Sequence, residues 1–140
     1  MEKCKRIPFS PPDISEKEVE EVAKVLMSGW ITSGPRLAEF ENKIEEYCEC
    51  NKAIALNSAT AAMELILKVL DIKEGDEIIT TPYTYTATSS VAIHRGIKPI
   101  YVDVAKDSFF MDYDKMADAI TDKTRVIMPV DIGGVPANYD

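Results

Sequence analysis

Residues 53–67 read AIALNSATAAMELIL, and the interpretation of the whole chain starts from this stretch. A short apolar run stops at Asn57 and Ser58, and a long apolar segment that contains Thr60 follows. A buried strand that turns into a buried helix through small hydroxyl residues presents free backbone N–H groups at the positive end of the helix dipole. The stretch therefore predicts a binding site for a phosphate group. The alternative is an ordinary helix N-cap formed by Ser58 or Asn57, with no ligand.

The composition of the 140 residues excludes several classes of protein. A formal net charge of −8 argues against sequence-independent binding to nucleic acid or acidic lipid, which needs clustered Lys and Arg. The chain has no run of 18 apolar residues, and its first residues, MEKCKRIPFSPP, lack the apolar core of a signal peptide. The three cysteines have no accompanying metal-ligand pattern, so no metal site is predicted and reduced thiols in a cytoplasmic protein are expected.

Strand and helix patterns alternate along most of the chain. The predicted helices cover residues 16–28, 35–48, 59–70, 84–95 and 114–120, and the predicted strands cover residues 53–56, 77–81, 98–102 and 124–129. This alternation predicts an α/β fold with a mainly parallel sheet covered by helices. We expect residues 1–52 to form an N-terminal arm with helices, and residues 53–140 to form the alternating part.

Ligands of parallel sheets bind beyond the carboxyl ends of the strands. Residues 57–60 and 81–85, together with Asp103 and Asp131, are expected at that edge. Tyr85 could stack on a planar cofactor there, and packing within the protein is the alternative. The loop SGWITSGP at residues 28–35 carries the single tryptophan, Trp30, which could form a substrate wall, an interface anchor or a cap on the core.

Several segments, in order and at matching spacing, resemble the DegT/DnrJ/StrS family of nucleotide-sugar aminotransferases, which use pyridoxal 5′-phosphate (PLP). The main segments are IPFSPPDIS at 7–15, SGWITSGP at 28–35 followed by LAEFE at 37–41, NSATAAMEL at 57–65, and GDEIITTPYTYTATSSV at 75–91. KPIYVDV at 98–104 and MPVDIGGVPANYD at 128–140 extend the match. The resemblance covers nearly all of the chain. It departs from the family at Ala59, where glycine is common, and at residues 133–135.

The resemblance implies the N-terminal portion of the aspartate-aminotransferase-like (fold type I) large domain. It implies that the cofactor is held by backbone groups of Ala59, Thr60 and Ala61, by the Thr60 hydroxyl and by the stacking ring of Tyr85. It places Gly29, Trp30, Ile31 and Thr32 near the nucleotide-sugar substrate. It further implies a homodimer that transfers an amino group, usually from glutamate, to a nucleotide-linked keto-sugar.

The same resemblance limits what this chain is expected to do. In the family, the lysine that binds PLP covalently and the acidic residue that pairs with the pyridine nitrogen lie downstream of residue 140. We therefore assign no catalytic residue, expect no covalent attachment of PLP at the family position, and interpret the chain as an N-terminal segment that is not catalytic alone. Residues 53–56 would lack a sheet neighbour, so we expect a lone chain to be unstable or to oligomerise.

Two other functions compete with this interpretation. A non-catalytic module could have kept the phosphate site for a nucleotide sugar or for assembly, and calorimetry with PLP and with a nucleotide sugar would separate the two. A small Rossmann-like oxidoreductase domain is disfavoured, because no G-x-G-x-x-G sequence follows any predicted strand. His94, the single histidine, has no evident catalytic partner and is expected at the surface.

Overall fold

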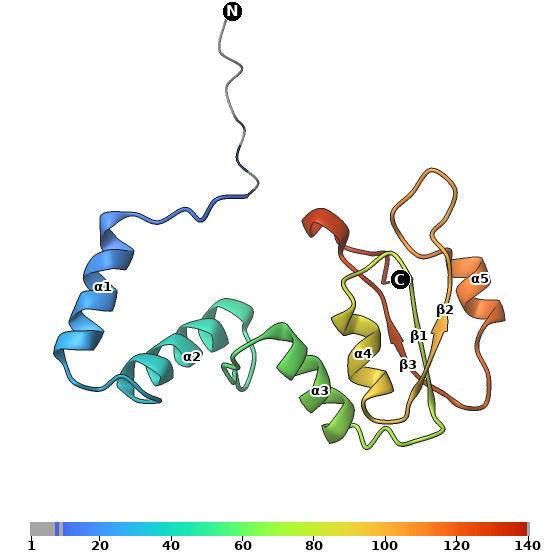
Figure 1. Cartoon of the computed structure of the whole chain (residues 1–140), viewed down its shortest axis with the longest axis horizontal. Coiled ribbons are helices and arrows are strands. Elements are labelled where there is room, and N and C mark those ends of the chain that lie inside the picture. Colours follow the sequence, from blue (N-terminus) through green and yellow to red (C-terminus); the bar gives the residue numbers. More distant parts are fainter. Residues whose placement is uncertain (1–7, 9, 140) are drawn as a thin grey trace, which may run out of the picture. The chain divides into compact units, whose positions relative to one another are not determined.

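A computed structural model describes residue 8 and residues 10–139 (Figure 1). The elements in chain order are α1(Glu16–Met27), α2(Pro35–Cys48), α3(Ala59–Val69), β1(Glu77–Thr80), α4(Ala87–Ile93), β2(Lys98–Tyr101), α5(Tyr113–Asp118), β3(Thr124–Met128) and the 3-10 turn η1(Ile132–Gly134). Contacts divide the chain into two compact units, of which the first ends at Ala55 and the second begins at Leu56. The two units are described separately.

The first unit consists of α1, α2 and the segment that follows α2. Ser15 caps α1 in a capping box with Glu18, as its sequence pattern predicts. Pro35 occupies the first turn of α2, where a missing N–H costs nothing, and Glu49 ends the helix with a left-handed backbone (φ 52°). Within the described part of this unit, neither helix contains a buried residue.

Residues 53–56 do not form the predicted strand. Their backbone is extended without a sheet partner, and the side chains of α2 take a strand's place. The Ala53 N–H donates to Glu45 Oε1 at 3.0 Å, and the Ala55 N–H donates to Glu41 Oε1 at 2.9 Å. The apolar pattern correctly indicated an extended segment, but a strand also needs a neighbour, and none of the described strands pairs with it. The expected unpaired N–H groups are thus satisfied at two positions.

The second unit contains a three-stranded sheet in the order β2-β1-β3, with both pairs parallel. Ile78 pairs with Pro99 on one side and with Val126 on the other, and an irregularity at Glu77 shifts the register against β3. β1 is the central strand and all four of its residues are buried. A central strand buried on both faces is typical of a parallel sheet between helices.

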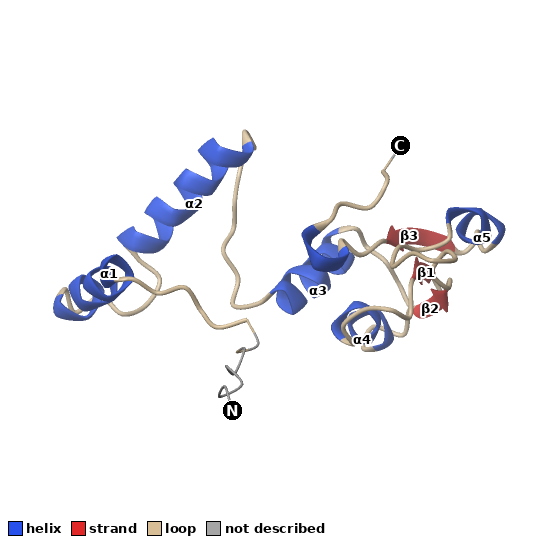
Figure 2. Ribbon diagram, turned by 90° about the horizontal axis from the view of Figure 1, so that it is seen from above, coloured by secondary structure: helices blue, strands red, loops and turns tan. Residues whose placement is uncertain are grey.

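Helices cover both faces of this sheet (Figure 2). Successive strand residues point to opposite faces, so Ile78 and Ile79 belong to different clusters. Ile78 packs under α3 and α4 with five other buried side chains, namely Leu67, Ile72, Val91, Ala92 and Ile97. Ile79 packs with Val102 and Met111, against which α5 contributes Met116. The α/β architecture predicted for this part of the chain is confirmed.

The boundaries of α4 and α5 differ from the predicted ones. The helix expected over 84–95 begins at Ala87, which leaves Thr84 and Tyr85 in the loop after β1. The helix expected over 114–120 runs from Tyr113 to Asp118, with Asp112 as its N-cap. No helix among the described residues is long and apolar enough to cross a membrane.

Candidate functional site

The predicted phosphate site lies at the first turn of α3, and we call residues 57–61 the α3 cup. Ser58 is the N-cap, and its Oγ accepts the Ala61 N–H at 3.1 Å. Ser58 Oγ also lies 3.5 Å from Asn57 Oδ1, to which it can donate. The first N–H groups of a helix have no partner within the helix, so those of Ala59 and Thr60 remain for an anion. The Ala61 N–H, in contrast, is already engaged.

The α3 cup lies at the end of α3 that is remote from the connection to β1. The short turn after Val69 joins the end of α3 to the beginning of β1, so the two elements run in opposite directions (Figure 1). In α/β units with this connectivity, the first turn of such a helix is expected on the side of the carboxyl ends of the strands. Ala59 is exposed and Thr60 is partly exposed, so a ligand can reach the backbone there.

Aromatic side chains gather in the loops after β1 and β2. Tyr85 is 80% exposed, so its ring is not used in packing within the described residues. Tyr83 and Phe109 stack on one another, with ring centroids 5.5 Å apart and planes 21° from parallel. Both rings are still more than half exposed. The exposed Tyr85 ring fits the predicted stacking role, whereas the Tyr83–Phe109 pair is a feature that the sequence pattern did not reveal.

The two aspartates expected at this edge are used in loop structure. Asp131 Oδ1 accepts the Ala137 N–H at 2.9 Å and the Tyr139 hydroxyl at 2.9 Å. This hydrogen bond to a carboxylate raises the pKa of Tyr139, because the ionised phenol would face a negative group. Asp103 Oδ1 accepts the N–H of its neighbour Val104 at 2.8 Å. Both carboxylates follow strands as expected, and both hold the backbone of their own loops.

The Trp30 loop connects α1 to α2 in the first unit. The indole N–H of Trp30 donates to the Ser33 carbonyl at 2.8 Å, and the ring folds against Gly34. A Cβ at Gly34 would lie 2.2 Å from the indole nitrogen, so this glycine is needed for close approach. Trp30 is 58% exposed, so within the described part of the first unit it does not cover a buried core. The loop lines a cavity of 470 Å³ with Ile31, Thr32 and residues of both helices.

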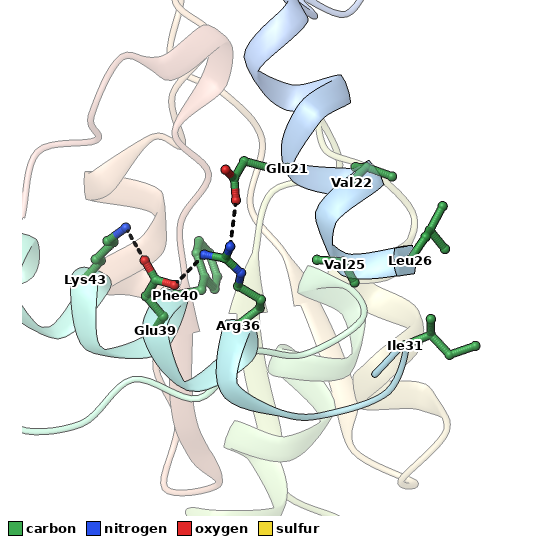
Figure 3. Close-up of a pocket in the computed structure, with 9 residues that line it drawn as sticks. All are labelled: Glu21, Val22, Val25, Leu26, Ile31, Arg36, Glu39, Phe40 and Lys43. Atoms are coloured by element: carbon green, nitrogen blue, oxygen red, sulfur yellow. Dashed lines mark hydrogen bonds and ion pairs between the residues drawn. The ribbon is translucent and has the colours of Figure 1, made fainter. Parts of the chain in front are cut away.

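An apolar groove of 510 Å³ lies between α1 and α2 beside this loop (Figure 3). Its apolar lining consists of Val22, Val25 and Leu26 from α1, Ile31 from the loop and Phe40 from α2. A chain of ion pairs runs along its rim, from Glu21 to Arg36 at 3.2 Å, from Arg36 to Glu39 at 2.9 Å and from Glu39 to Lys43 at 2.8 Å. These side chains are about half exposed or more, and ion pairs of this kind contribute little stability.

The histidine and the described cysteines form no further catalytic or metal-binding cluster among the described residues. His94 is at the surface, as predicted, and its Nδ1 lies 3.5 Å from Glu64 Oε1. Cys48 and Cys50 are exposed free thiols, while Cys4 lies outside the described residues. The described part of the chain contains no group of three or more side chains that could hold a metal ion.

Sequence reasoning missed the role of two acidic residues on α2. In the sequence, Glu41, Lys43, Glu45 and Glu46 form a charged run that is typical of a solvated helix face. In the structure, Glu41 and Glu45 are partly buried, and each accepts a backbone N–H of residues 53–55. Their spacing of four residues is the one available signal, because it places both carboxylates on the same side of a helix. That signal does not say what lies opposite them.

Comparisons with known proteins give consistent matches. The model of the DegT/DnrJ/EryC1/StrS aminotransferase family matches residues 12–140. The spore coat polysaccharide biosynthesis protein SpsC of Bacillus subtilis is 37% identical over 96% of this chain and 34% of its own length. The UDP-4-amino-4-deoxy-L-arabinose–oxoglutarate aminotransferase of Shewanella sediminis is 40% identical, over 96% of this chain and 34% of its own length.

Solved structures agree with these matches. The PLP form of a protein from Streptococcus pneumoniae, assigned as a sugar aminotransferase, superposes with a TM-score of 0.91 and 52% identity, over 95% of this chain and 34% of that one. The chain thus spans about a third of the length of the relatives it matches. Its parallel sheet and helices are part of the fold type I domain of PLP-dependent aminotransferases. The chain belongs to the DegT/DnrJ/EryC1/StrS aminotransferase family.

Proposed function

We propose that this chain is the N-terminal segment of a PLP-dependent aminotransferase that transfers an amino group, from glutamate, to a nucleotide-linked keto-sugar. The observation that carries the proposal is the α3 cup, where the N–H groups of Ala59 and Thr60 lie free at the positive end of a helix. The exposed Tyr85 ring supports it. Family membership and relatives solved in PLP and PMP forms point to the same cofactor.

The residues present fit the phosphate and the ring of PLP. The backbone of Ala59 and Thr60 would hold the phosphate, with the Thr60 hydroxyl as a further donor. In this structure the Ala61 N–H can join them only if Ser58 releases it. Tyr85 would cover one face of the ring. Bound PLP supplies an electron sink for amino-group transfer, and these residues bind and orient it.

The substrate part of the proposal concerns the Trp30 loop in the first unit. Gly29, Trp30, Ile31 and Thr32 are proposed to contact the nucleotide sugar. The name of the Shewanella relative contains a UDP-linked amino sugar and oxoglutarate. Oxoglutarate is the keto acid that glutamate becomes when it gives up its amino group, so the name supports this substrate class and glutamate as the amino donor. We also propose that the enzyme is a cytoplasmic homodimer.

We propose that residues 1–140 bind the cofactor without catalysing transfer. None of the lysines present matches the family's PLP-binding motif, so no residue of this chain is assigned to move the proton at the substrate carbon.

Isothermal calorimetry of the chain with PLP, with pyridoxal and with UDP-glucose tests this function. We expect saturable binding of PLP and much weaker binding of pyridoxal, which lacks the phosphate. A Thr60→Ala variant should weaken the binding of PLP, while Lys68→Gln, at an exposed position in the last turn of the same helix, should leave it unchanged. Binding of UDP-glucose without binding of PLP would instead identify a non-catalytic nucleotide-sugar module.

A further inference from the structure

Two carboxylates of α2 lie along one edge of residues 53–55. Glu41 Oε1 accepts the Ala55 N–H at 2.9 Å, and Glu45 Oε1 accepts the Ala53 N–H at 3.0 Å. The two alanines are partly buried, as are both glutamates. All four residues belong to the first unit, so the arrangement is complete within one compact part of the chain.

The spacings of the two elements explain why these bonds occur as a pair. Residues four apart on an α-helix share one face and are separated by a rise of about 6 Å. Residues two apart in an extended chain direct their N–H groups to the same edge and are separated by about 6.6 Å. Glu41 contacts the later alanine and Glu45 the earlier one, so helix and segment run in opposite directions. The helix therefore presents acceptors at nearly the repeat of a neighbouring strand.

A lysine strengthens the contact at one end. Lys52 Nζ lies 2.7 Å from the same Glu45 oxygen that accepts the Ala53 N–H. Both contacts lower the pKa of Glu45, with the lysine hydrogen bond as the larger cause. Hydrogen bonds to an ionised acceptor are stronger than those between neutral groups. Glu45 is therefore held as a carboxylate at neutral pH.

We propose that Glu41 and Glu45 are positioning residues that replace a neighbouring strand along one edge of residues 53–55. The two glutamates keep the backbone of residues 53–55, which precedes the α3 cup in the chain, in an extended conformation. They also prevent another strand from pairing along this edge. The Ile54 backbone faces the opposite edge, so any strand that joins this segment must do so there. The two hydrogen bonds join backbone N–H groups to side-chain carboxylates, so this role does not depend on what the α3 cup binds.

Amide hydrogen exchange of the 140-residue chain, followed by NMR, tests the proposal residue by residue. Glu41→Ala should accelerate exchange of the Ala55 amide by about tenfold, and Glu45→Ala should do the same for Ala53, as expected for one lost charge-assisted hydrogen bond. Glu41→Gln and Glu45→Gln should restore protection, because the amide oxygen still accepts. Glu46→Ala, on the same helix, is the control and should change neither amide.

Two results would overturn the proposal. One is exchange of Ala53 and Ala55 in the unchanged chain as fast as in an unstructured peptide. The other is equal loss of protection in the Gln and Ala variants, since a general packing role would not distinguish them by an acceptor oxygen. If the Ala variants unfold the first unit, as judged by the α2 amides, the Gln variants decide: retained protection supports the proposal and lost protection contradicts it.

Discussion

The hydroxyl of Ser58 determines how many donors the α3 cup offers. It caps α3 by accepting the Ala61 N–H, which leaves the N–H groups of Ala59 and Thr60 for a ligand. The ordinary N-cap and the phosphate site, which are alternatives in the sequence, are therefore compatible in the structure. The same turn can be stable without a ligand and still bind an anion.

Substitutions at Ser58 should separate stability from binding. Ser58→Ala removes the cap and should lower the free energy of unfolding by about 1 kcal/mol, measured by urea denaturation. Ser58→Asp should keep the stability, because aspartate is an effective N-cap, but should weaken PLP binding by about tenfold or more through repulsion of the phosphate. Unchanged PLP affinity in Ser58→Asp would show that the phosphate binds elsewhere.

The position of the Trp30 ring depends on the absence of a side chain at Gly34. The indole ring occupies the space that a side chain at residue 34 would fill. The backbone of Gly34 is extended (φ −169°), a conformation open to any residue, so conformational freedom does not explain this glycine. Close packing under the tryptophan explains it better.

Among the elements, Glu77 links the beginnings of all three strands. Its carboxylate accepts the Thr121 hydroxyl at 2.7 Å, just before β3, and contacts Lys98 of β2 at 3.3 Å. The Thr121 hydrogen bond is the main cause that lowers the pKa of Glu77 from its ordinary value of 4.5. The side chain is 9% exposed, so these contacts hold a buried carboxylate in its charged form.

This lowered pKa predicts a specific dependence on pH. A carboxyl group whose pKa is lower in the folded state stabilises the fold above its unfolded pKa, and that contribution is lost as the pH falls through the folded pKa. The unfolding free energy should therefore decline below about pH 4.5, and Glu77→Gln should decline less steeply. Urea denaturation between pH 7 and pH 3 measures both. If the unfolding free energies of the unchanged chain and of Glu77→Gln fall in parallel with pH, Glu77 is not a cause of the pH dependence.

The sequence predicted most elements because their signals are local. β1, β2, β3 and α1 to α3 lie within a few residues of their predicted positions, since apolar periodicity and caps such as Ser15 mark them. The prediction of a strand at residues 53–56 was wrong, because a strand also needs a partner strand, which is supplied by residues distant in the sequence. Glu41 and Glu45 were missed for the same reason, since a solvated helix face and a face with two buried acceptors have the same spacing.

At the scale of the whole molecule, the two units differ in how much they bury. The second unit has apolar clusters on both faces of its sheet. In the first unit Val19, Val22 and Leu26 of α1 remain about 60% exposed. Exposed apolar side chains that gather on one face of a helix mark surfaces that contact other proteins. The apolar face of α1 is thus left uncovered within the first unit.

We therefore predict that the 140-residue chain self-associates or unfolds at low concentration. Sedimentation velocity should show a mass that rises with protein concentration, and Val22→Glu should reduce the association by placing a charge in the apolar face. Glu20→Gln, directed away from Val22 on the same helix, is the matched control. A monomer with a sharp melting transition that does not depend on concentration would count against this prediction.

The central claim is that the first turn of α3 holds the phosphate of PLP. The most direct test records the amide chemical shifts of the chain during titration with PLP and, separately, with pyridoxal. We expect PLP to shift the Ala59 and Thr60 amides most strongly and pyridoxal to leave them in place. Equal shifts with both compounds, or PLP-dependent shifts that spare Ala59 and Thr60, would contradict it.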